Sequence, residues 1–529
     1  MIGPGARTPI LRNQALVSFV VFLAGLYIAW KTGGWIAEED MGTLTLSFVA
    51  VAVAAIAVTI VRNWRTGFYL FLTWLLFEDL IRKYLGNNMY IYFAKDVLAL
   101  FTCLSLFMVI RRGKEAAFRA PFLLPLWVFF WLGVLQMFNP HSPSLLYGLL
   151  GLKMYFYYAP LMFVGYALVR SDEDLQRFLI GNIALAGVIS TLGIIQGIVG
   201  PSFMSPATLA PEIRELGALE RVTPISHIKI SLPTATFVST GRFAWYLILA
   251  WILTLGTTGY LLLRSRHGRK LAFPAVGLVA VSAMLSGSRG AVVYCAVSAV
   301  VLAAAFLWGA PWRWRLAHRL WKAIRRFTLV AAISLAIFIF FFPTAIGSRW
   351  AFYSETLSPD SPSSELGWRT WDYPLQNLML AFTDPNWIIG NGIGTASLGV
   401  QYVSAFLGEH PPGIGVENGY GTLIVELGIL GLVLWLVWTA ALLIAAWKIV
   451  RSLKETPLFP IGFAIFWFVF ILLIPLTYGG FQCFENYVYN AYFWLLIGVL
   501  FRLPSLLVGP PGQIATAAPV AARPRWFLG

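Results

Sequence analysis

Long apolar stretches recur along almost the whole chain, separated by short polar segments. A stretch of about 20 apolar residues is long enough to cross the hydrocarbon core of a bilayer as a helix. The pattern therefore predicts an all-α, polytopic membrane protein with about 14 transmembrane helices. The predicted spans cover residues 15–30, 43–61, 67–81, 90–110, 121–138, 151–169, 178–199, 240–263, 271–286, 290–308, 327–343, 419–447, 459–478 and 484–501.

Basic residues are concentrated in alternate loops between these spans. The basic loops comprise residues 62–65, 111–119, 170–177, 264–270, 313–326 and 448–454. Cytoplasmic loops carry an excess of Lys and Arg, so these loops and both termini are assigned to the cytoplasm. No convincing small-residue cleavage site follows the first span, which is therefore interpreted as a retained helix.

The composition supports a membrane location. Hydrophobic residues make up 59% of the 529 residues and charged residues only 12%, whereas soluble domains carry about 25% charged residues. A net charge of +15 would suit a nucleic-acid-binding protein, but the basic residues are dispersed over short loops and form no compact basic domain. We therefore expect membrane lipids as partners and no nucleic acid.

Several common kinds of site have no counterpart in the sequence. The cytoplasmic loops contain no glycine-rich phosphate-binding motif, and no His-Glu-x-x-His zinc motif is present. The three cysteines, Cys103, Cys295 and Cys483, are far apart and have no metal-ligand spacing. No cofactor and no metal are expected, so energy for a reaction would come from the substrate or from an ion gradient.

The chain is expected to form one transmembrane domain over residues 1–502, followed by a flexible cytoplasmic tail at 503–529, which is rich in Pro and Ala. Two non-cytoplasmic loops, about 200–239 and 344–418, are much longer than the others, and long loops are often functional. Aromatic residues in the second loop predict short amphipathic helices along the membrane surface. Pro374 should kink or break any helix there.

Basic residues on the outer side are the first candidates for binding. Arg242 begins the eighth span, Arg289 lies in a Ser-Arg-Gly turn, and Arg369 lies in the aromatic loop. Converging guanidinium groups would bind a diphosphate well, because each offers paired donors and keeps its charge. Lys153 is a further candidate for a lipid phosphate, near an outer helix start. The alternative is that these residues anchor helix ends at the lipid headgroups.

Carboxylates at helix starts are the candidates for proton transfer. Glu417 and Asn418 precede the long twelfth span, and Glu485 begins the last span in a similar way. A carboxylate near the low-dielectric rim of the membrane suits a general base. The supporting candidates are Asn418, Glu426, Glu485 and His410. A carboxylate at a helix start is also commonly structural, because the helix dipole favours it.

Two further pairs of charges are interpreted as structural. Glu78 with Arg82, and Asp79 with Lys83, have the i,i+4 spacing that brings two side chains together on a helix. Both pairs fall at an outer helix end.

Several stretches together resemble the O-antigen ligase and polymerase family of bacterial surface polysaccharide assembly. They are TFVSTGRFAWYL at 236–247, SGSRG at 286–290, Arg369 in the large loop, GNGIGTAS at 390–397 and VENGYGTLIVELGILGLVL at 416–434. None is specific alone; the resemblance rests on their order, spacing and sidedness. The first half of the chain matches only as a hydropathy profile.

The resemblance implies a GT-C-type membrane glycosyltransferase in a bacterial inner membrane. It implies a glycan donor on undecaprenyl diphosphate and metal-independent, inverting transfer to an acceptor sugar hydroxyl on the periplasmic face. Trp368, Trp371 and Tyr373 would stack on sugar rings. Chain-length-regulating or export proteins are partners that such an enzyme would have.

One departure from the family affects the choice of acceptor. Ligases of the family carry a His where this chain has Glu417. The difference favours a polysaccharide polymerase, with Glu417 as the catalytic base, over a ligase that transfers the glycan to a lipid or protein. A lipid-linked sugar flippase or secondary transporter is the alternative from another class, and it should place ionisable groups near the middle of the membrane.

Overall fold

The computed structural model describes residues 55–85, 89–113, 115, 118–205, 219–264, 269–311, 325, 336, 339–411 and 413–507. The predicted span 15–30, most of 43–61 and 327–343, and the tail from residue 508 lie outside the described residues.

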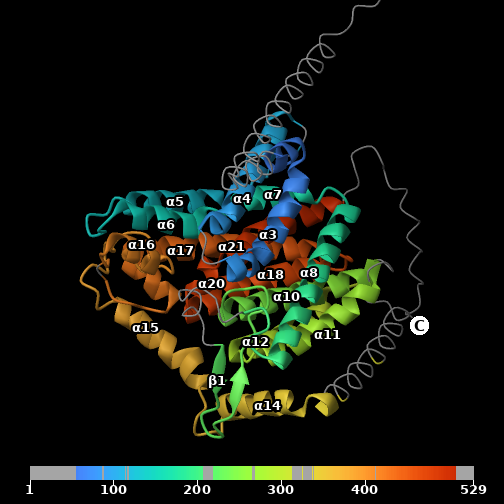
Figure 1. Ribbon diagram of the computed structural model, residues 1–529. Coiled ribbons are helices and arrows are strands. Elements are labelled where there is room, and N and C mark those ends of the chain that lie inside the picture. The colour runs from blue at the N-terminus through green and yellow to red at the C-terminus, as the bar shows by residue number, and fades with distance from the viewer. Residues whose placement is uncertain are drawn as a thin grey trace, which may run out of the picture.

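Within the described residues the protein is almost entirely helical (Figure 1). Its α-helices are α3 (Trp64–Leu85), α4 (Met89–Arg111), α5 (Leu123–Gln136), α6 (Leu145–Phe156), α7 (Leu161–Leu168), α8 (Asp172–Val199), α10 (Thr240–Arg264), α11 (Arg269–Leu285), α12 (Arg289–Gly309), α14 (Pro343–Leu357), α15 (Tyr373–Ala381), α16 (Val400–Leu407), α17 (Gly419–Ser452), α18 (Phe459–Ile471), α19 (Thr477–Gly479), α20 (Gln482–Glu485) and α21 (Tyr487–Arg502). Two π-helical turns, η1 (Trp368–Asp372) and η2 (Leu472–Leu476), and a final 3₁₀ turn, η3 (Leu503–Leu506), complete the helical elements.

Long apolar helices confirm a polytopic membrane protein. Among the described residues, 6 helices are long and apolar enough to cross a bilayer. They are Tyr90–Arg111, Asp172–Val199, Thr240–Leu263, Arg289–Gly309, Gly419–Ser452 and Phe459–Gly479. Leu123–Gln136 and Lys270–Leu285 are shorter apolar helices.

One predicted span is not a continuous helix. The sequence pattern predicts a helix over 151–169, but the structure has two, α6 and α7, joined by a turn that ends at Pro160. Proline has no backbone N–H and cannot continue the hydrogen-bond ladder of α6. The first helix also begins earlier, where the Ser144 side chain accepts a hydrogen bond from the N–H of Leu146.

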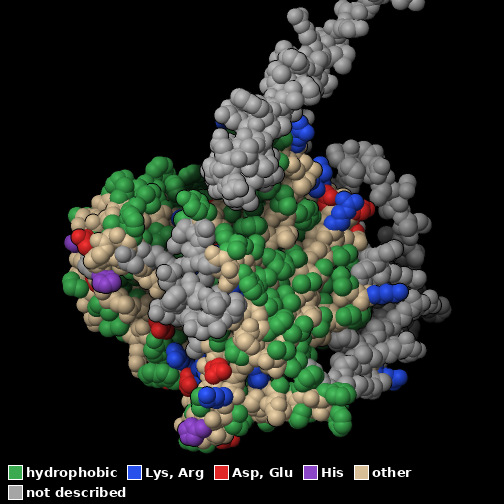
Figure 2. Space-filling model, in the orientation of Figure 1, with side chains coloured by type: hydrophobic (Ala, Val, Ile, Leu, Met, Phe, Trp, Pro, Cys, Tyr) green, Lys and Arg blue, Asp and Glu red, His purple; other side chains and the backbone are tan. Residues whose placement is uncertain are grey.

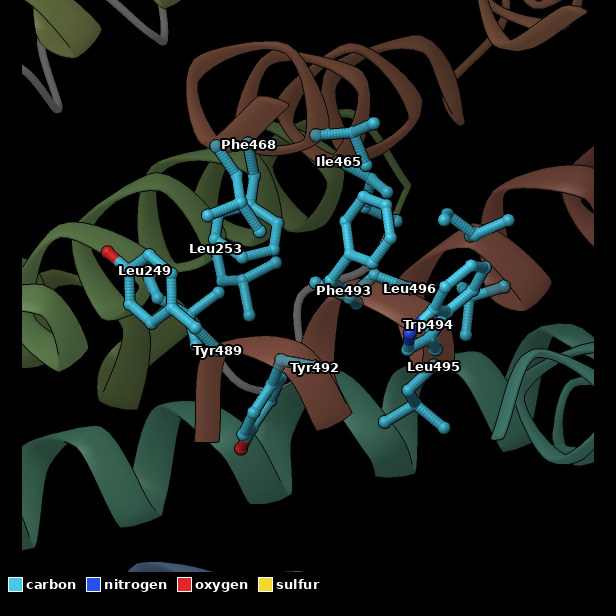
Figure 3. Packing of buried hydrophobic residues seen from close by; sticks show 14 of the residues in the cluster. Leu249, Leu253, Ile465, Phe468, Tyr489, Tyr492, Phe493, Trp494, Leu495 and Leu496 are labelled. Carbon is cyan, nitrogen blue, oxygen red and sulfur yellow. The ribbon is translucent and has the colours of Figure 1, made fainter. Parts of the chain in front are cut away.

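Helix α21 lies at the centre of the packing. Every residue from Tyr487 to Leu500 is buried, and the helix packs against α7, α10 and α18. Figure 3 shows side chains of α21 between those of α10 and α18, with Tyr492 turned toward α8, where its hydroxyl donates to Asn182 Oδ1 at 2.6 Å. A helix that is apolar on all sides is expected to be buried in this way.

Helices α7 and α21 approach closely because each carries a glycine at the contact. A Cβ on Gly165 would lie 2.0 Å from the carbonyl oxygen of Leu495, and one on Gly498 would lie 2.0 Å from that of Met162. Small residues allow such backbone contact between membrane helices.

The two long loops form structure outside the packed helices. A short antiparallel pair, β1 (Glu220–Val222) and β2 (Lys229–Ser231), adds to the expected all-α fold. With α14 and α15, it lies along the lower border of the molecule in Figure 1. Figure 2 shows charged side chains gathered at the right-hand and lower borders of this face, with a broad hydrophobic area between them. This distribution is what a membrane-facing surface requires.

Candidate functional site

Three of the sequence-predicted site residues line one cavity of about 600 Å³. Arg289, Arg369 and Glu417 face it, together with Glu365. We call it the arginine cavity. Its walls come from the start of α12, from η1, from the segment before α17 and from the end of α18 through α20, so segments distant in sequence build it.

The turn before α12 positions Arg289. The Ser288 side chain caps the helix by accepting a hydrogen bond from the N–H of Ala291 at 3.3 Å. Gly287 has a φ of +67°, and a Cβ there would lie 2.3 Å from a methyl group of Leu232. The turn therefore requires glycine at this position. Arg289 is the first helical residue, and its guanidinium lies 5.6 Å from the ring centre of Phe352.

A carboxylate bridges the two arginines of the cavity. Glu365 Oε1 lies 2.7 Å from Nη1 of Arg289, and its Oε2 lies 3.4 Å from Nε of Arg369. The hydrogen bond from Arg289 is the main reason that the pKa of Glu365 is lowered. Phosphate oxygens accept hydrogen bonds from guanidinium groups in the same way.

Prolines shape two walls of the arginine cavity. Arg369 lies in η1, directly before α15, where Pro374 occupies the first turn. Pro475 lies inside η2 and faces the cavity. Each proline lacks the N–H that a regular helix would use, and the helix widens to a π turn close to it. The helix expected to kink or break at Pro374 is not broken: it widens to a π turn, and Asp372 and Tyr373 keep helical backbone angles.

Glu417 lies just outside the start of α17. Its side chain is exposed, and its N–H donates to Asn377 Oδ1 at 3.1 Å. Burial, followed by a hydrogen bond to Glu417, raises the pKa of Tyr373, which places that hydroxyl beside the carboxylate. Glu417 forms no ion pair with any described residue, so the carboxylate lone pairs that Tyr373 does not use are open to a ligand.

Asn418 fixes the backbone that presents Glu417. Its buried side chain accepts from the N–H of Gly421 at 2.9 Å and donates to the carbonyl oxygens of Pro374 at 2.9 Å and Tyr478 at 2.7 Å. The start of α17 is thereby tied to both α15 and α19. Asn418 supports the site through these bonds.

Arg221, in β1, was missed by sequence reasoning. Arg221 is exposed on β1, and desolvation, followed by the charge of Arg289 and then that of Arg369, lowers its pKa. The hairpin tip is held by Glu355, which accepts from the N–H of Ile225 at 2.8 Å. An isolated arginine in a loop of this length carries no local signal, because only the fold brings it to the site.

Arg242 and Lys153 lie in a separate, mostly buried group of charges. Arg242 pairs with Asp79 at 2.9 Å, and Lys153 pairs with Asp96 at 2.6 Å. Neither lines the arginine cavity; Arg242 instead faces a second cavity of about 330 Å³. Lys153 lies in the last turn of α6, not near a helix start as predicted, because α6 begins earlier.

The predicted pairs at the end of α3 form only in part. Arg82 approaches both Glu78, at 3.6 Å, and Asp79, at 3.2 Å. Lys83 does not form the expected pair with Asp79: its ammonium donates to Thr234 Oγ1 at 2.7 Å and to the Ala235 carbonyl at 2.8 Å. The loop before α10 supplies these acceptors, which the local i,i+4 spacing cannot reveal.

The glycine run at 390–394 folds back against α17. Gly428 interrupts that helix with a φ of +71°, and the N–H of Gly392 donates to the carbonyl oxygen of Glu426 at 3.0 Å. Gly394 has a φ of +87°, and a Cβ there would lie 2.0 Å from the carbonyl oxygen of Tyr147. The positive φ and the close backbone contact at Gly394 require glycine there.

Two further carboxyl groups lie under this turn. Glu426 is fully buried and accepts from Ser397 Oγ at 2.6 Å and Tyr155 Oη at 2.8 Å. Glu485 accepts from the N–H of Leu398 at 3.0 Å. Glu485, His410 and Glu417 line a third cavity, of about 350 Å³. Glu426 does not line this cavity, because its side chain is buried behind Ser397 and Tyr155, which bond to it.

The three predicted stacking residues surround Arg369. Trp368 and Trp371 are exposed, and the rings of Trp368 and Tyr373 lie 5.9 Å apart. None of the three lines the arginine cavity directly. The aromatic residues that line it are Trp245, Tyr294 and Tyr478, and the Tyr478 ring lies 6.1 Å from that of Trp371.

No group of three or more His, Cys, Asp or Glu residues suited to a metal ion occurs within the part of the chain that the structure describes. The cations of the site are supplied by arginine.

Comparisons of the chain with protein-family models, with curated proteins and with solved structures find no match.

Proposed function

We propose that the protein is a membrane glycosyltransferase that polymerises a glycan, using a donor linked to undecaprenyl diphosphate. The observation that carries this proposal is the arginine cavity, where two arginines and an available carboxylate face the same space. The resemblance in sequence supplies the substrate class.

The reaction follows from the roles that these side chains suit. Glu417 takes the proton of an acceptor hydroxyl as its oxygen attacks the anomeric carbon of the donor. A new bond forms between that oxygen and the anomeric carbon, while the bond from this carbon to the phosphate oxygen breaks. The electron pair leaves with the diphosphate, and Arg289 and Arg369 stabilise its negative charge. A single displacement inverts the anomeric configuration.

Glu365 gives the empty cavity a defined geometry. Its carboxylate holds both guanidinium groups in place. A diphosphate offers more oxygens to the same donors and would displace it or share them. Preorganised cations need little rearrangement when charge develops on the leaving group.

The proposal includes a topology and an architecture. It comprises about 14 spans, a GT-C-like arrangement, both termini in the cytoplasm and the arginine cavity on the periplasmic face of a bacterial inner membrane. The alternation of basic loops supports this orientation.

A lipid-linked sugar flippase is the second candidate. The buried charges around Asp79 favour it, because ionisable groups inside a membrane bundle often mark a transport path. In the structure each carboxylate of this group has a basic partner, which equally suits a structural role.

Deleting the gene and analysing the cell's glycans tests the proposal. Loss of a polymerase leaves surface products of a single repeat, whereas loss of a ligase leaves polymer on its lipid carrier. Loss of a flippase leaves lipid-linked repeats on the cytoplasmic face. The last two outcomes would each contradict a polymerase, and restoration by the intact gene is the control.

A further inference from the structure

A third cavity, of about 350 Å³, adjoins the arginine cavity. The two share Glu417 and Gln482 in their linings, so the carboxylate stands between them. A volume of this size lies at the lower end of the range for small-ligand sites.

The lining of the third cavity combines apolar residues with polar side chains and contains no Lys or Arg. Gln401, His410 and Gln482 face it, together with the carboxyl groups of Glu417 and Glu485. Without Lys or Arg, the lining offers a phosphate no guanidinium or ammonium donor. Amide, imidazole and carboxyl groups instead suit a neutral ligand rich in hydroxyl groups, since a hydroxyl can both donate and accept.

One carboxyl oxygen of Glu485, at the wall of the third cavity, has no hydrogen-bond partner among the described residues. The residue is only 4% exposed, and its Oε1 has no hydrogen bond to any described residue. An unsatisfied buried polar atom costs about 1–3 kcal/mol, so such an atom calls for an explanation.

Two glutamines in the lining of the third cavity can also form hydrogen bonds to a ligand. The side-chain amides of Gln401 and Gln482 are exposed and form no hydrogen bond within the described residues. Phe481 contributes an apolar surface to the same lining, and sugar rings have apolar faces as well as hydroxyl groups.

We propose that this cavity, called the acceptor cavity below, binds the acceptor sugar, with Glu485, Gln401 and Gln482 contacting its hydroxyl groups. The inference rests on the proposed function and adds to it the location and chemical class of the second substrate. A hydroxyl bound there meets Glu417 from the side opposite Arg289 and Arg369. This is the order that an attack on the donor's anomeric carbon requires.

Binding of simple sugars to the purified full chain tests the assignment. The probes are methyl glycosides of glucose, galactose, mannose and rhamnose, observed by saturation-transfer NMR in detergent. At least one should bind, and saturating inorganic pyrophosphate should not displace it. The assignment of the acceptor cavity would be overturned if none of the four glycosides gave a saturation-transfer signal, or if pyrophosphate displaced the bound glycoside.

Variants locate the bound sugar. Gln401→Ala and Glu485→Met should each weaken binding of the glycoside by about tenfold or more, the effect of losing a ligand hydrogen bond. Gln176→Ala, a glutamine at the start of α8 that bonds Asp172, is the matched control and should bind normally. Gln401 is exposed, so its variant should fold even if Glu485→Met does not. Normal binding by Gln401→Ala would contradict the assignment.

Transfer assays separate this inference from the proposed function. Lipid-linked oligosaccharide extracted from deletion cells serves as the substrate. Gln401→Ala should raise KM for the acceptor about tenfold with little change in kcat, whereas Glu417→Gln should lower kcat. If Glu417→Gln lowers kcat but Gln401→Ala leaves KM unchanged, the acceptor cavity is assigned wrongly, whereas the proposed glycosyltransferase function is still supported. If Glu417→Gln and Arg289→Lys are both normal, the proposed function itself fails.

Discussion

Two helices of this protein begin with the same dipeptide but present its carboxylate to different surroundings. Asn418 caps α17 with φ −61° and ψ 129°, and Asn486 caps α21 with φ −63° and ψ 119°. The preceding Glu417 is exposed between two cavities, whereas the preceding Glu485 is buried. The same local conformation thus supports two chemical roles. The environment, and not the helix start, decides which carboxylate can act as a base.

Replacing Glu417 should have the largest effect. Glu417→Gln keeps the size of the side chain and removes its basicity, and general-base assistance contributes about 10²–10⁴-fold. We expect transfer at least about a hundredfold slower, with normal thermal unfolding. A structural helix-start charge contributes only about 0.3–1 kcal/mol to stability and hardly anything to rate. A near-normal rate would make Glu417 equivalent to any other helix-start carboxylate.

Arginine replacements test why Glu417 differs from Glu485. Of these two carboxylates, Glu417 lines the cavity of Arg289 and Arg369, whereas Glu485 does not. Arg289→Lys and Arg369→Lys keep the charge but lose the planar, paired donors, so transfer should fall by about tenfold or more. Arg177→Lys, an exposed arginine at the start of α8, is the control. Unchanged transfer in both cavity variants would assign them to headgroup anchoring.

Replacing the two capping residues, Asn418 and Asn486, should destabilise the protein to different extents. Asn418 accepts one hydrogen bond and donates two across the fold, whereas Asn486 accepts from Val488 and Tyr489 within its own helix. Asn486→Ala should cost about 1–2 kcal/mol, and Asn418→Ala about 1–3 kcal/mol more because two buried carbonyls lose their donor. Thermal unfolding in detergent measures which variant loses more stability, and equal decreases in the unfolding temperature of the two variants would contradict this prediction.

The smallest effect should come from Glu365. Its pKa is lowered by Arg289, so the pair contributes stability above the ordinary Glu pKa of about 4.3 and loses it as pH falls through the lower folded value. Because the carboxylate is 38% exposed, solvent screening limits the contribution to about 1 kcal/mol or less. The wild type and Glu365→Gln should therefore differ slightly at pH 7 and converge in strong acid. A difference that grows on acidification would contradict this linkage.

Hydrophobic pattern predicted much of the fold, because membrane helices need long apolar stretches. Spans such as 240–263 and 419–447 correspond to α10 and α17. The pattern failed at 151–169, where Pro160 separates two helices within an apolar run. Hydropathy alone cannot distinguish a continuous helix from two buried ones.

The candidate site was predictable where one residue type carries the chemistry. Arg289, Arg369 and Glu417 stood out as charges beside apolar spans, and the fold brings them to one cavity. Arg242 stood out in the same way, but Asp79 pairs with it in the fold. The availability of a charge depends on such distant partners. Gln401 had no local signal at all, because neutral amides are common in loops.

The most direct test of the central claim uses the purified full chain with lipid-linked oligosaccharide from deletion cells, in detergent with a metal chelator. The account predicts glycans longer by whole repeats, with one undecaprenyl diphosphate released for each new linkage. Glycans of unchanged length, without release of the carrier and with protein that unfolds normally, would contradict it.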